Sequence, residues 1–268
     1  MPDNDDVVVI TGASGGIGAA LAKRLGRDGK RLVLAARREP ALRSVASDAE
    51  ALGATGALVV ATDVTRREAV NHLRDAALEA FGRIDVWVNN AGRGITRPVL
   101  ELADADVDEM ISVNLKSALY GMQAVIPHFV ERGTGHLINI STFLGRVPIA
   151  PYRSVYSASK AALNSLTANL RMDLRANNPN IHVSLVMPGV VATDFAPNAK
   201  TPDALRPDLP GRSNAGPIQT PEEVADRIAD LIRSPEAEIY TNPASPEIVR
   251  DYYSDVAAFE NRLAQRRP

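Results

Sequence analysis

The stretch VVVITGASGGIGAALAKRLGRDG, residues 7–29, decides the fold class. Its first four residues are β-branched and predict a buried strand. Ile17, Leu21 and Leu25 then recur at the spacing of one helix face, and Gly26 and Gly29 follow as stop signals. A glycine-rich turn joins the two segments, so the stretch predicts a strand–turn–helix unit of an α/β protein.

The turn itself, TGASGGIG at 11–18, has the composition of a phosphate-binding loop. Its glycines permit a tight turn and a close approach of backbone to a pyrophosphate, and the N–H groups of the following helix point at that charge. An ordinary glycine turn is the alternative, but the flanking strand and amphipathic helix favour a dinucleotide site. The candidate residues in this turn are Gly12, Ser14, Gly16, Ile17 and Gly18.

Similar units follow along the chain. Further short apolar runs occur at 31–36, 57–63, 84–90, 136–141, 182–189 and 237–243, and helical patterns lie between them, the longest at 104–133. This alternation predicts an α/β fold, a doubly wound parallel β-sheet of about seven strands flanked by helices on both faces. We expect one domain over 1–268, with the proline-rich segment 194–221 as the substrate-binding loop and 244–268 as a helical tail.

Composition narrows the functional classes. The chain has 30 basic and 32 acidic residues and a net charge of -2, which gives no reason to expect nucleic acid or a membrane as partner. It has no cysteine, so thiol chemistry is excluded, and its four histidines lack metal-ligand spacing, so no metal is predicted. Neither a secretory signal nor an apolar run of about 20 residues is present, so we expect a cytoplasmic protein.

The end of the second predicted strand indicates which dinucleotide binds. An acidic residue there would hydrogen-bond the ribose 2′-hydroxyl of NAD. The sequence LVLAARRE at 32–39 instead has Ala36 at this point, followed by Arg37 and Arg38. Arginine binds phosphate bidentately, and Ser14 could add a hydroxyl, so the sequence favours NADP(H) over NAD(H).

Tyr156 and Lys160 form the candidate acid–base pair. They lie four residues apart in YSASK, on one face of a predicted helix, with only small residues between them. A free phenol has a pKa near ~10, and a nearby ammonium favours its ionised form. We interpret the two residues as a proton-transfer pair; the alternative is an ordinary helix surface.

Together with TDVT (62–65), NNAG (89–92), SVNLKSA (112–118), NIST (139–142) and PGVVAT (188–193), these motifs resemble, in order, the short-chain dehydrogenase/reductase family. The resemblance covers roughly residues 5–194 and implies a Rossmann-like fold. It implies Tyr156 as proton donor, Lys160 as its partner and Asn114 as the holder of a water relay. The cofactor contacts that it implies are Asp63, Val64, Asn90, Ala91, Gly92, Tyr156, Lys160, Pro188, Gly189, Val191 and Thr193.

The family's third catalytic group is a serine hydroxyl that binds the substrate carbonyl, and here the chain departs from the pattern. The hydroxyl usually precedes a glycine by three residues, which selects Thr142 before Gly145 rather than Ser141. Adjacent strand residues face opposite sides, so only one of the two can point into the site. We favour Thr142 and keep Ser141 as the alternative.

The resemblance implies a hydride transfer between NADP(H) and a ketone, aldehyde or secondary alcohol. Because the 194–221 loop has few charges placed to bind an anion, the sequence favours an uncharged substrate. Phe143, Tyr152 and Arg93 adjoin the motifs and are candidate pocket residues. We expect a homodimer or homotetramer that pairs through the helices carrying Asn114 and Tyr156. A non-catalytic NADP-binding redox sensor and a sugar epimerase or dehydratase are the rival functions.

Overall fold

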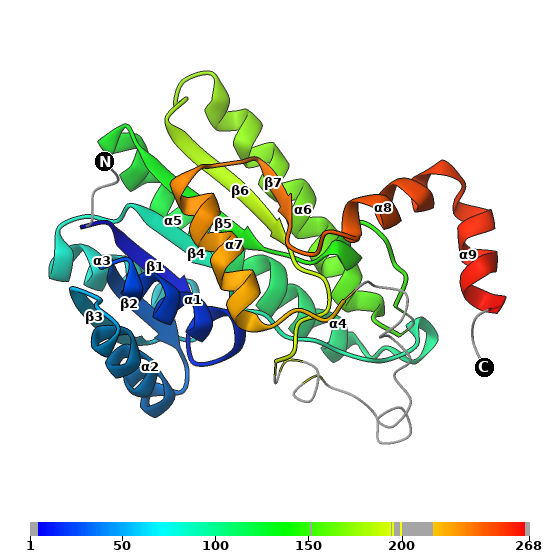
Figure 1. Cartoon of the computed structure of the whole chain (residues 1–268), viewed down its shortest axis with the longest axis horizontal. Helices are drawn as coiled ribbons and strands as arrows, with labels where there is room; N and C mark the ends of the chain where they lie inside the picture. Colours follow the sequence, from blue (N-terminus) through cyan, green and yellow to red (C-terminus); the bar gives the residue numbers. More distant parts are fainter. Residues whose placement is uncertain (1–4, 151, 194, 196–198, 200–216, 266–268) are drawn as a thin grey trace.

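The computed structural model describes residues 5–150, 152–193, 195, 199 and 217–265. Its strands form one parallel sheet in the order β3-β2-β1-β4-β5-β6-β7 (Figure 1). The strands are β1 (Val7–Thr11), β2 (Arg31–Ala36), β3 (Gly56–Ala61), β4 (Val86–Asn89), β5 (Gly135–Ile140), β6 (Ile181–Met187) and β7 (Glu238–Tyr240). The predicted doubly wound parallel sheet is confirmed.

Helices pack on both faces of this sheet. One core cluster joins α1, α2 and α7 to the sheet, and a second joins α3, α5 and α6 to its other face. The helices are α1 (Gly16–Arg27), α2 (Glu39–Ala51), α3 (Arg67–Phe81), α4 (Asp104–Ile111), α5 (Ser117–Arg132), α6 (Ser154–Arg175), α7 (Pro221–Arg233), α8 (Ser245–Ser254) and α9 (Val256–Gln265).

Strand β1 shows why its β-branched run has no polar residue. Val8 and Ile10 belong to the cluster under α1, α2 and α7, whereas Val7 and Val9 belong to the cluster on the other face. All four side chains are fully buried. Successive side chains of a strand point to opposite faces, so a run in a central strand covered on both sides can be apolar at successive positions.

The strand order reverses between β1 and β4. From β1 the chain proceeds outward to β2 and β3, and from β4 it proceeds in the other direction to β7. In open parallel sheets ligands bind outside the carboxyl ends of the strands at such a switch point. The glycine turn after β1 and the NNAG segment, which begins with the last residue of β4, both lie there.

The long helical pattern predicted at 104–133 is interrupted at its centre. Five residues, Ser112–Lys116, adopt a π-helix between α4 and α5, and Asn114 is the middle one. A π-turn inserts one extra residue into the helical repeat and is frequent at functional sites. Periodicity alone predicted a helix here but not this change of its register.

The chain ends in two helices that extend away from the sheet, α8 and α9 (Figure 1). Ile248 of α8 packs on a small cluster of Phe143, Leu185 and Met187, and the Tyr253 hydroxyl donates to the Arg146 carbonyl at 2.9 Å. Ile248 therefore packs α8 against the end of β6, and Tyr253 ties it to the segment that follows β5.

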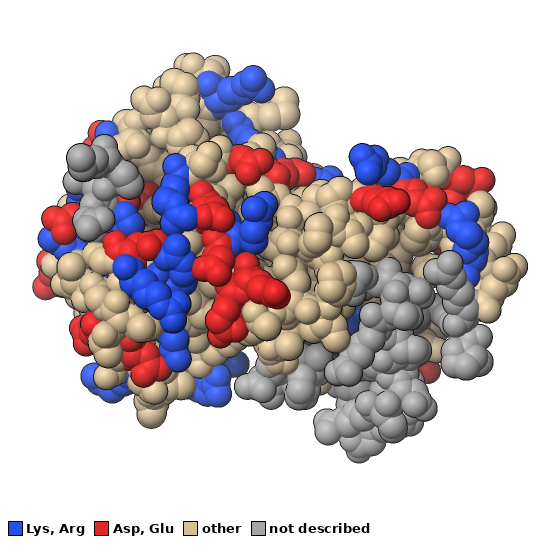
Figure 2. Space-filling model, in the orientation of Figure 1, with Lys and Arg blue, Asp and Glu red and all other residues tan. Residues whose placement is uncertain are grey.

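On the face that carries α1 and α7, acidic and basic side chains are interspersed (Figure 2). Arg24 of α1 pairs with Asp226 of α7 at 2.8 Å, which is one example of this mixing. Within the described ranges, no helix has the length and apolar character needed to span a membrane.

Candidate active site

The glycine turn after β1 packs directly against the segment that follows β4. A Cβ at Gly12, whose φ is 67°, would lie 2.9 Å from the Ala91 Cα, and one at Gly18 would lie 2.5 Å from the Gly12 carbonyl oxygen. The Asn90 side-chain amide donates to the Thr11 carbonyl at 2.9 Å. Both glycines are therefore required because backbone occupies the space that a side chain would need.

The amino-terminal end of α1 offers backbone donors without a side-chain cap. Gly15 is the N-cap residue and makes no side-chain hydrogen bond, so the first N–H groups of the helix have no side-chain partner. A cavity of about 290 Å³ adjoins this end and is lined by residues that include Gly16, Lys23 and Thr193. Bare backbone donors, a helix amino terminus and an adjacent cavity fit the pyrophosphate of a dinucleotide.

The predicted phosphate-binding side chains lie together beside this turn. The Arg38 guanidinium reaches the Ser14 hydroxyl at 3.3 Å and the Ser14 carbonyl at 3.4 Å. Two hydrogen bonds from Thr65 to the Asp63 carboxylate lower the pKa of Asp63, and the charge of Arg37 lowers it further. Ser14, Arg37, Arg38 and Asp63 thus surround one region beyond the ends of β1, β2 and β3.

Tyr156 is buried at the start of α6. Its side chain belongs to a cluster with Ile95, Met110 and Val155, and its ring lies 5.6 Å from that of Phe195. Burial raises the pKa of Tyr156 to about 12, although the charge of Arg153 and side-chain hydrogen bonding with Thr142 act to lower it. The surrounding residues therefore hold the proton on the phenol, which is the opposite of the lowered pKa that the sequence suggested.

Lys160 lies one turn further along α6 and is also buried. Its ammonium donates to the Ile140 carbonyl at 2.8 Å, and burial lowers its pKa to about 8. A Cβ at Gly92 would lie 3.6 Å from the Lys160 Nζ and 3.3 Å from the Asn114 Oδ1. Lys160 and Asn114 therefore converge on the glycine of the NNAG segment, where the lack of a side chain leaves room.

The backbone of Arg93 holds both the oxygen and the nitrogen of the Asn114 side-chain amide. Its Oδ1 accepts from the Arg93 N–H at 2.9 Å, and its Nδ2 donates to the Arg93 carbonyl at 3.0 Å and to the Ser159 hydroxyl at 3.1 Å. The Ser159 hydroxyl in turn donates to the Tyr156 carbonyl at 2.7 Å. Asn114 therefore links the segment after β4 to the helix that carries Tyr156.

The two hydroxyls at the end of β5 point in different directions. The Ser141 hydroxyl donates to the Asn164 Oδ1 at 2.5 Å and is buried against α6. The Thr142 hydroxyl donates to the Pro188 carbonyl at 3.3 Å and also acts on the phenol of Tyr156. Strand alternation therefore separates them as expected, and Thr142 is the one that shares the side of Tyr156.

The PGVVAT segment connects the two ends of the site. The Pro188 carbonyl accepts from Thr142, whereas the Thr193 methyl carbon would lie 3.3 Å from a Cβ at Gly16. Val191 pairs with Gln219 in an isolated bridge, and a Cβ at Gly189 would lie 3.0 Å from the Asn242 side chain. The segment thus runs from the Thr142–Tyr156 hydroxyls to the glycine turn and could cover a dinucleotide along that path.

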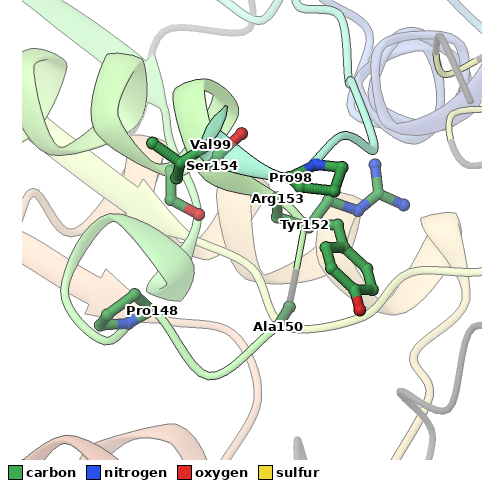
Figure 3. Close-up of a pocket in the computed structure, with 8 residues that line it drawn as sticks. Pro98, Val99, Pro148, Ala150, Tyr152, Arg153 and Ser154 are labelled. Atoms are coloured by element: carbon green, nitrogen blue, oxygen red, sulfur yellow. The ribbon is translucent and has the colours of Figure 1, made fainter. Parts of the chain in front are cut away.

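A second cavity of about 330 Å³ lies beside the first turn of α6 (Figure 3). It is lined by Pro98, Val99, Pro148, Ala150, Tyr152, Arg153, Ser154 and Ser157. Tyr152, with a φ of 63°, thus lies in a cavity wall, but Phe143 does not, because its side chain is buried against Leu185 and Met187. Of the predicted loop 194–221, only 195, 199 and 217–221 are among the described residues.

Sequence reasoning missed Arg153. It lies three residues before Tyr156, is the N-cap residue of α6, and its charge acts on the phenol. Its position one helical turn before Tyr156 was the available signal, but nothing in the sequence showed where its side chain points. Among the residues that the structure describes, no group of three or more metal-ligating side chains gathers.

A doubly wound sheet with a glycine turn at its switch point and a Tyr–Lys pair beyond β5 defines a class of dinucleotide-binding oxidoreductases. The short chain dehydrogenase family matches residues 6–204, and this chain belongs to that family.

Three similar proteins support this assignment. An uncharacterized oxidoreductase of Staphylococcus saprophyticus is 36% identical over 231 residues, which cover 82% of this chain and 92% of the relative. A short chain dehydrogenase/reductase of Burkholderia phymatum in complex with NAD is 32% identical, with 96% of each chain covered and a TM-score of 0.83. An alcohol dehydrogenase of Thermococcus sibiricus complexed with 5-hydroxy-NADP is 28% identical, with 88% and 95% covered and a TM-score of 0.76. The chain is therefore an oxidoreductase of this family, whose solved members bind either dinucleotide.

Proposed function

We propose that this protein transfers a hydride between NADP(H) and a ketone, aldehyde or secondary alcohol, with Tyr156 as the proton donor and acceptor. The observation that carries the proposal is the pairing of the Thr142 and Tyr156 hydroxyls beside Lys160, next to a backbone cradle that fits a pyrophosphate. A carbonyl group placed between these hydroxyls would have both a hydrogen-bond donor and a proton source.

Each side chain has a separate role in the reduction. The bound cofactor supplies a hydride, that is, two electrons with one hydrogen, to the carbonyl carbon. Thr142 donates a hydrogen bond to the carbonyl oxygen and so stabilises its developing negative charge. Tyr156 gives its proton to that oxygen, and Lys160 with the Asn114 relay returns a proton to the phenolate.

The raised pKa of Tyr156 suits reduction because the phenol keeps its proton at neutral pH. Oxidation of an alcohol requires the opposite state, with the phenolate as base. The positive charge of an oxidised nicotinamide beside the ring would favour that state, as would a charged Lys160. The same residues can therefore serve both directions, with the Tyr156 phenol protonated for reduction and ionised for oxidation.

The preference for NADP(H) is the finer part of the proposal. The Arg38–Ser14 contact is what supports it, because a 2′-phosphate would find a guanidinium and a hydroxyl at the same point. In the described part of the chain, Ala36 ends β2 where an acid would repel that phosphate. The cytoplasmic location and the homodimer or homotetramer remain predictions from the sequence.

The direct test is turnover with each cofactor. The absorbance of the reduced nicotinamide should fall when NADPH is mixed with the enzyme and a panel of ketones and aldehydes. NADH should support a lower kcat/KM on the same substrates. Tight NADPH binding without turnover of any carbonyl would favour the rival function of a redox sensor, and equal kcat/KM values with NADH would contradict the cofactor assignment.

A further inference from the structure

A buried arginine nitrogen beside Tyr156 has no partner in the part of the chain that the structure describes. It is the Nη1 of Arg153, which is inaccessible to solvent and makes no hydrogen bond there. Arg93 and Arg97, on the neighbouring segment, pair with Glu109 and Asp106 at 2.5 and 3.3 Å. Burying an unsatisfied donor is unfavourable, and more so for a charged group, so this unpaired nitrogen calls for an explanation.

The position of this nitrogen links it to the candidate active site. A Cβ at Gly94 would lie 3.0 Å from the Arg153 Nη1 and 2.9 Å from the ring of Phe195. The same Phe195 ring lies 5.6 Å from that of Tyr156. Arg153 and Phe195 therefore both lie next to Gly94, and the Phe195 ring connects them to Tyr156.

Arg153 contributes to the wall of the cavity beside α6, but its guanidinium extends away from several of the other lining residues. Figure 3 shows the guanidinium of Arg153 extending beyond Pro98 and away from Pro148 and Val99. Backbone contacts on both sides of Arg153 fix the start of this side chain. The Arg97 N–H donates to the Tyr152 carbonyl at 2.7 Å, and the Ser154 hydroxyl donates to the Arg97 carbonyl at 2.8 Å.

Among the described charged groups, none neutralises this guanidinium. It takes part in no described ion pair, and burial lowers its pKa, while the nearby Tyr156 acts to raise it. Because Tyr156 keeps its proton at neutral pH, it supplies no negative charge there. A guanidinium presents parallel N–H donors that match the two oxygens of a carboxylate. The cluster therefore offers a carboxylate both its charge and its hydrogen bonds, close to the group that handles the carbonyl.

We propose that Arg153 binds a carboxylate of the substrate, so that the enzyme reduces oxo acids and oxidises hydroxy acids in preference to neutral carbonyl compounds. This inference rests on the proposed function and names its substrate class. It departs from the uncharged substrate that the sequence favoured, because that expectation considered only the charges of the 194–221 loop. Arg153 lies outside the loop, at the start of α6.

The reaction itself is unchanged and balanced. The carbonyl carbon of the oxo acid accepts the hydride of the reduced cofactor, and the carbonyl oxygen accepts the proton of Tyr156. The products are the hydroxy acid and the oxidised cofactor. The carboxylate takes no part in bond making and serves only to orient the carbonyl towards Thr142 and Tyr156.

The test compares oxo acids of increasing length with their amides, which have the same shape without the charge. With NADPH, the wild type should turn over at least one oxo acid about tenfold or more better, in kcat/KM, than its amide. Arg153→Met should lower kcat/KM on that acid by about 10- to 100-fold, mainly through KM, and leave the amide within a few-fold. The kcat/KM of Arg153→Lys on the acid should lie between those of the wild type and of Arg153→Met, because lysine keeps the charge but not the paired donors.

The matched control is Arg146→Met, which removes a guanidinium that already pairs with Glu238 at 2.6 Å. Circular dichroism and the melting temperature would establish that each variant folds. Equal losses on acid and amide in Arg153→Met, falling in kcat, would overturn the inference and make Arg153 a positioning residue for Tyr156. An unchanged kcat/KM on both substrates would overturn it as well.

A binding measurement separates this inference from the proposed function. Calorimetry with the same oxo acids and amides should show acid-selective binding to the wild type that Arg153→Met abolishes. If that binding occurs without any turnover, the carboxylate site stands and the proposed function fails. If neutral carbonyl compounds are turned over and no acid-selective binding is found, the proposed function stands and the carboxylate site fails.

Discussion

The two ends of the site are built in different ways. At the pyrophosphate end, between the glycine turn and the NNAG segment, backbone packs on backbone, and a Cβ at Gly12 or Gly18 would overlap main-chain atoms. At the carbonyl end, between β5 and α6, the arrangement depends on which way side chains point, as with Ser141 and Thr142. Residue types alone identify the pyrophosphate end from the sequence, whereas the arrangement at the carbonyl end can be seen only in the structure.

The largest contrast should come from the two hydroxyls of the carbonyl end. We expect Thr142→Ala to lower kcat by about 10²-fold or more, because a donor to the developing oxyanion is lost. Ser141→Ala should change kcat by only a few-fold and should lower the free energy of unfolding by about 1 kcal/mol, because Asn164 loses its partner. Steady-state kinetics and urea unfolding measure both, and a greater loss of kcat in Ser141→Ala would reverse the assignment.

At the pyrophosphate end, we expect Gly18→Ala to weaken NADPH binding by about 10- to 100-fold. Its Cβ would lie 2.5 Å from the Gly12 carbonyl and 2.6 Å from the Asn90 side chain, and such overpacking costs about 1–3 kcal/mol. Gly15→Ala is the matched control in the same turn, since its nearest neighbour would be the Arg38 guanidinium at 3.6 Å. Fluorescence titration gives the Kd of each variant, and equal weakening by both would refute the packing argument.

A smaller effect is expected from the side chains that flank this backbone cradle. Arg38→Ala should reduce the preference for NADPH over NADH about tenfold, because one charged hydrogen-bonding partner of the 2′-phosphate is removed. The control is Arg43→Ala, further along α2, whose guanidinium already pairs with Glu39. The ratio of kcat/KM for the two cofactors is the measurement, and a ratio that Arg38→Ala leaves unchanged would count against NADP(H) specificity.

The smallest expected effect is a pH dependence at the carbonyl end. Burial lowers the pKa of Lys160 to about 8, so the ammonium is charged below that pH and neutral above it. Because Tyr156 keeps its proton up to a pKa of about 12, we expect kcat/KM for reduction to fall as the pH rises through about 8. Lys160→Arg should abolish the fall, since arginine stays charged. A wild-type profile that is flat to pH 10 would show that the charge of Lys160 is not used.

The sequence predicted the fold because the patterns that define it are local. The β-branched run of β1, the glycine turn and the amphipathic α1 each identify themselves within a few residues, and the alternation repeats along the chain. The glycine turn and the NNAG segment could be placed beside each other because both follow strands on either side of the switch point.

The carbonyl end could not be predicted to the same depth. The sequence placed Tyr156 and Lys160 on one helix face, but it could not show that burial raises the pKa of Tyr156. Arg153 had only its position one helical turn before Tyr156 as a signal, because its place in the site depends on its proximity to Gly94 and Phe195, which are distant in the sequence. The π-helix around Asn114 likewise had no signal in the apolar periodicity of the sequence.

The most direct test of the account is the comparison of Tyr156→Phe with the wild type, in both NADPH binding and turnover of a carbonyl substrate. We expect the Kd for NADPH to stay within a few-fold and kcat to fall by about 10²- to 10⁴-fold, because only the proton donor is removed. Tyr120→Phe is the control and should keep its activity, because the Tyr120 ring lies under the Arg67 guanidinium and takes no part in the proposed mechanism. If Tyr156→Phe retained wild-type turnover, another group would supply the proton and the account of the carbonyl end would be wrong.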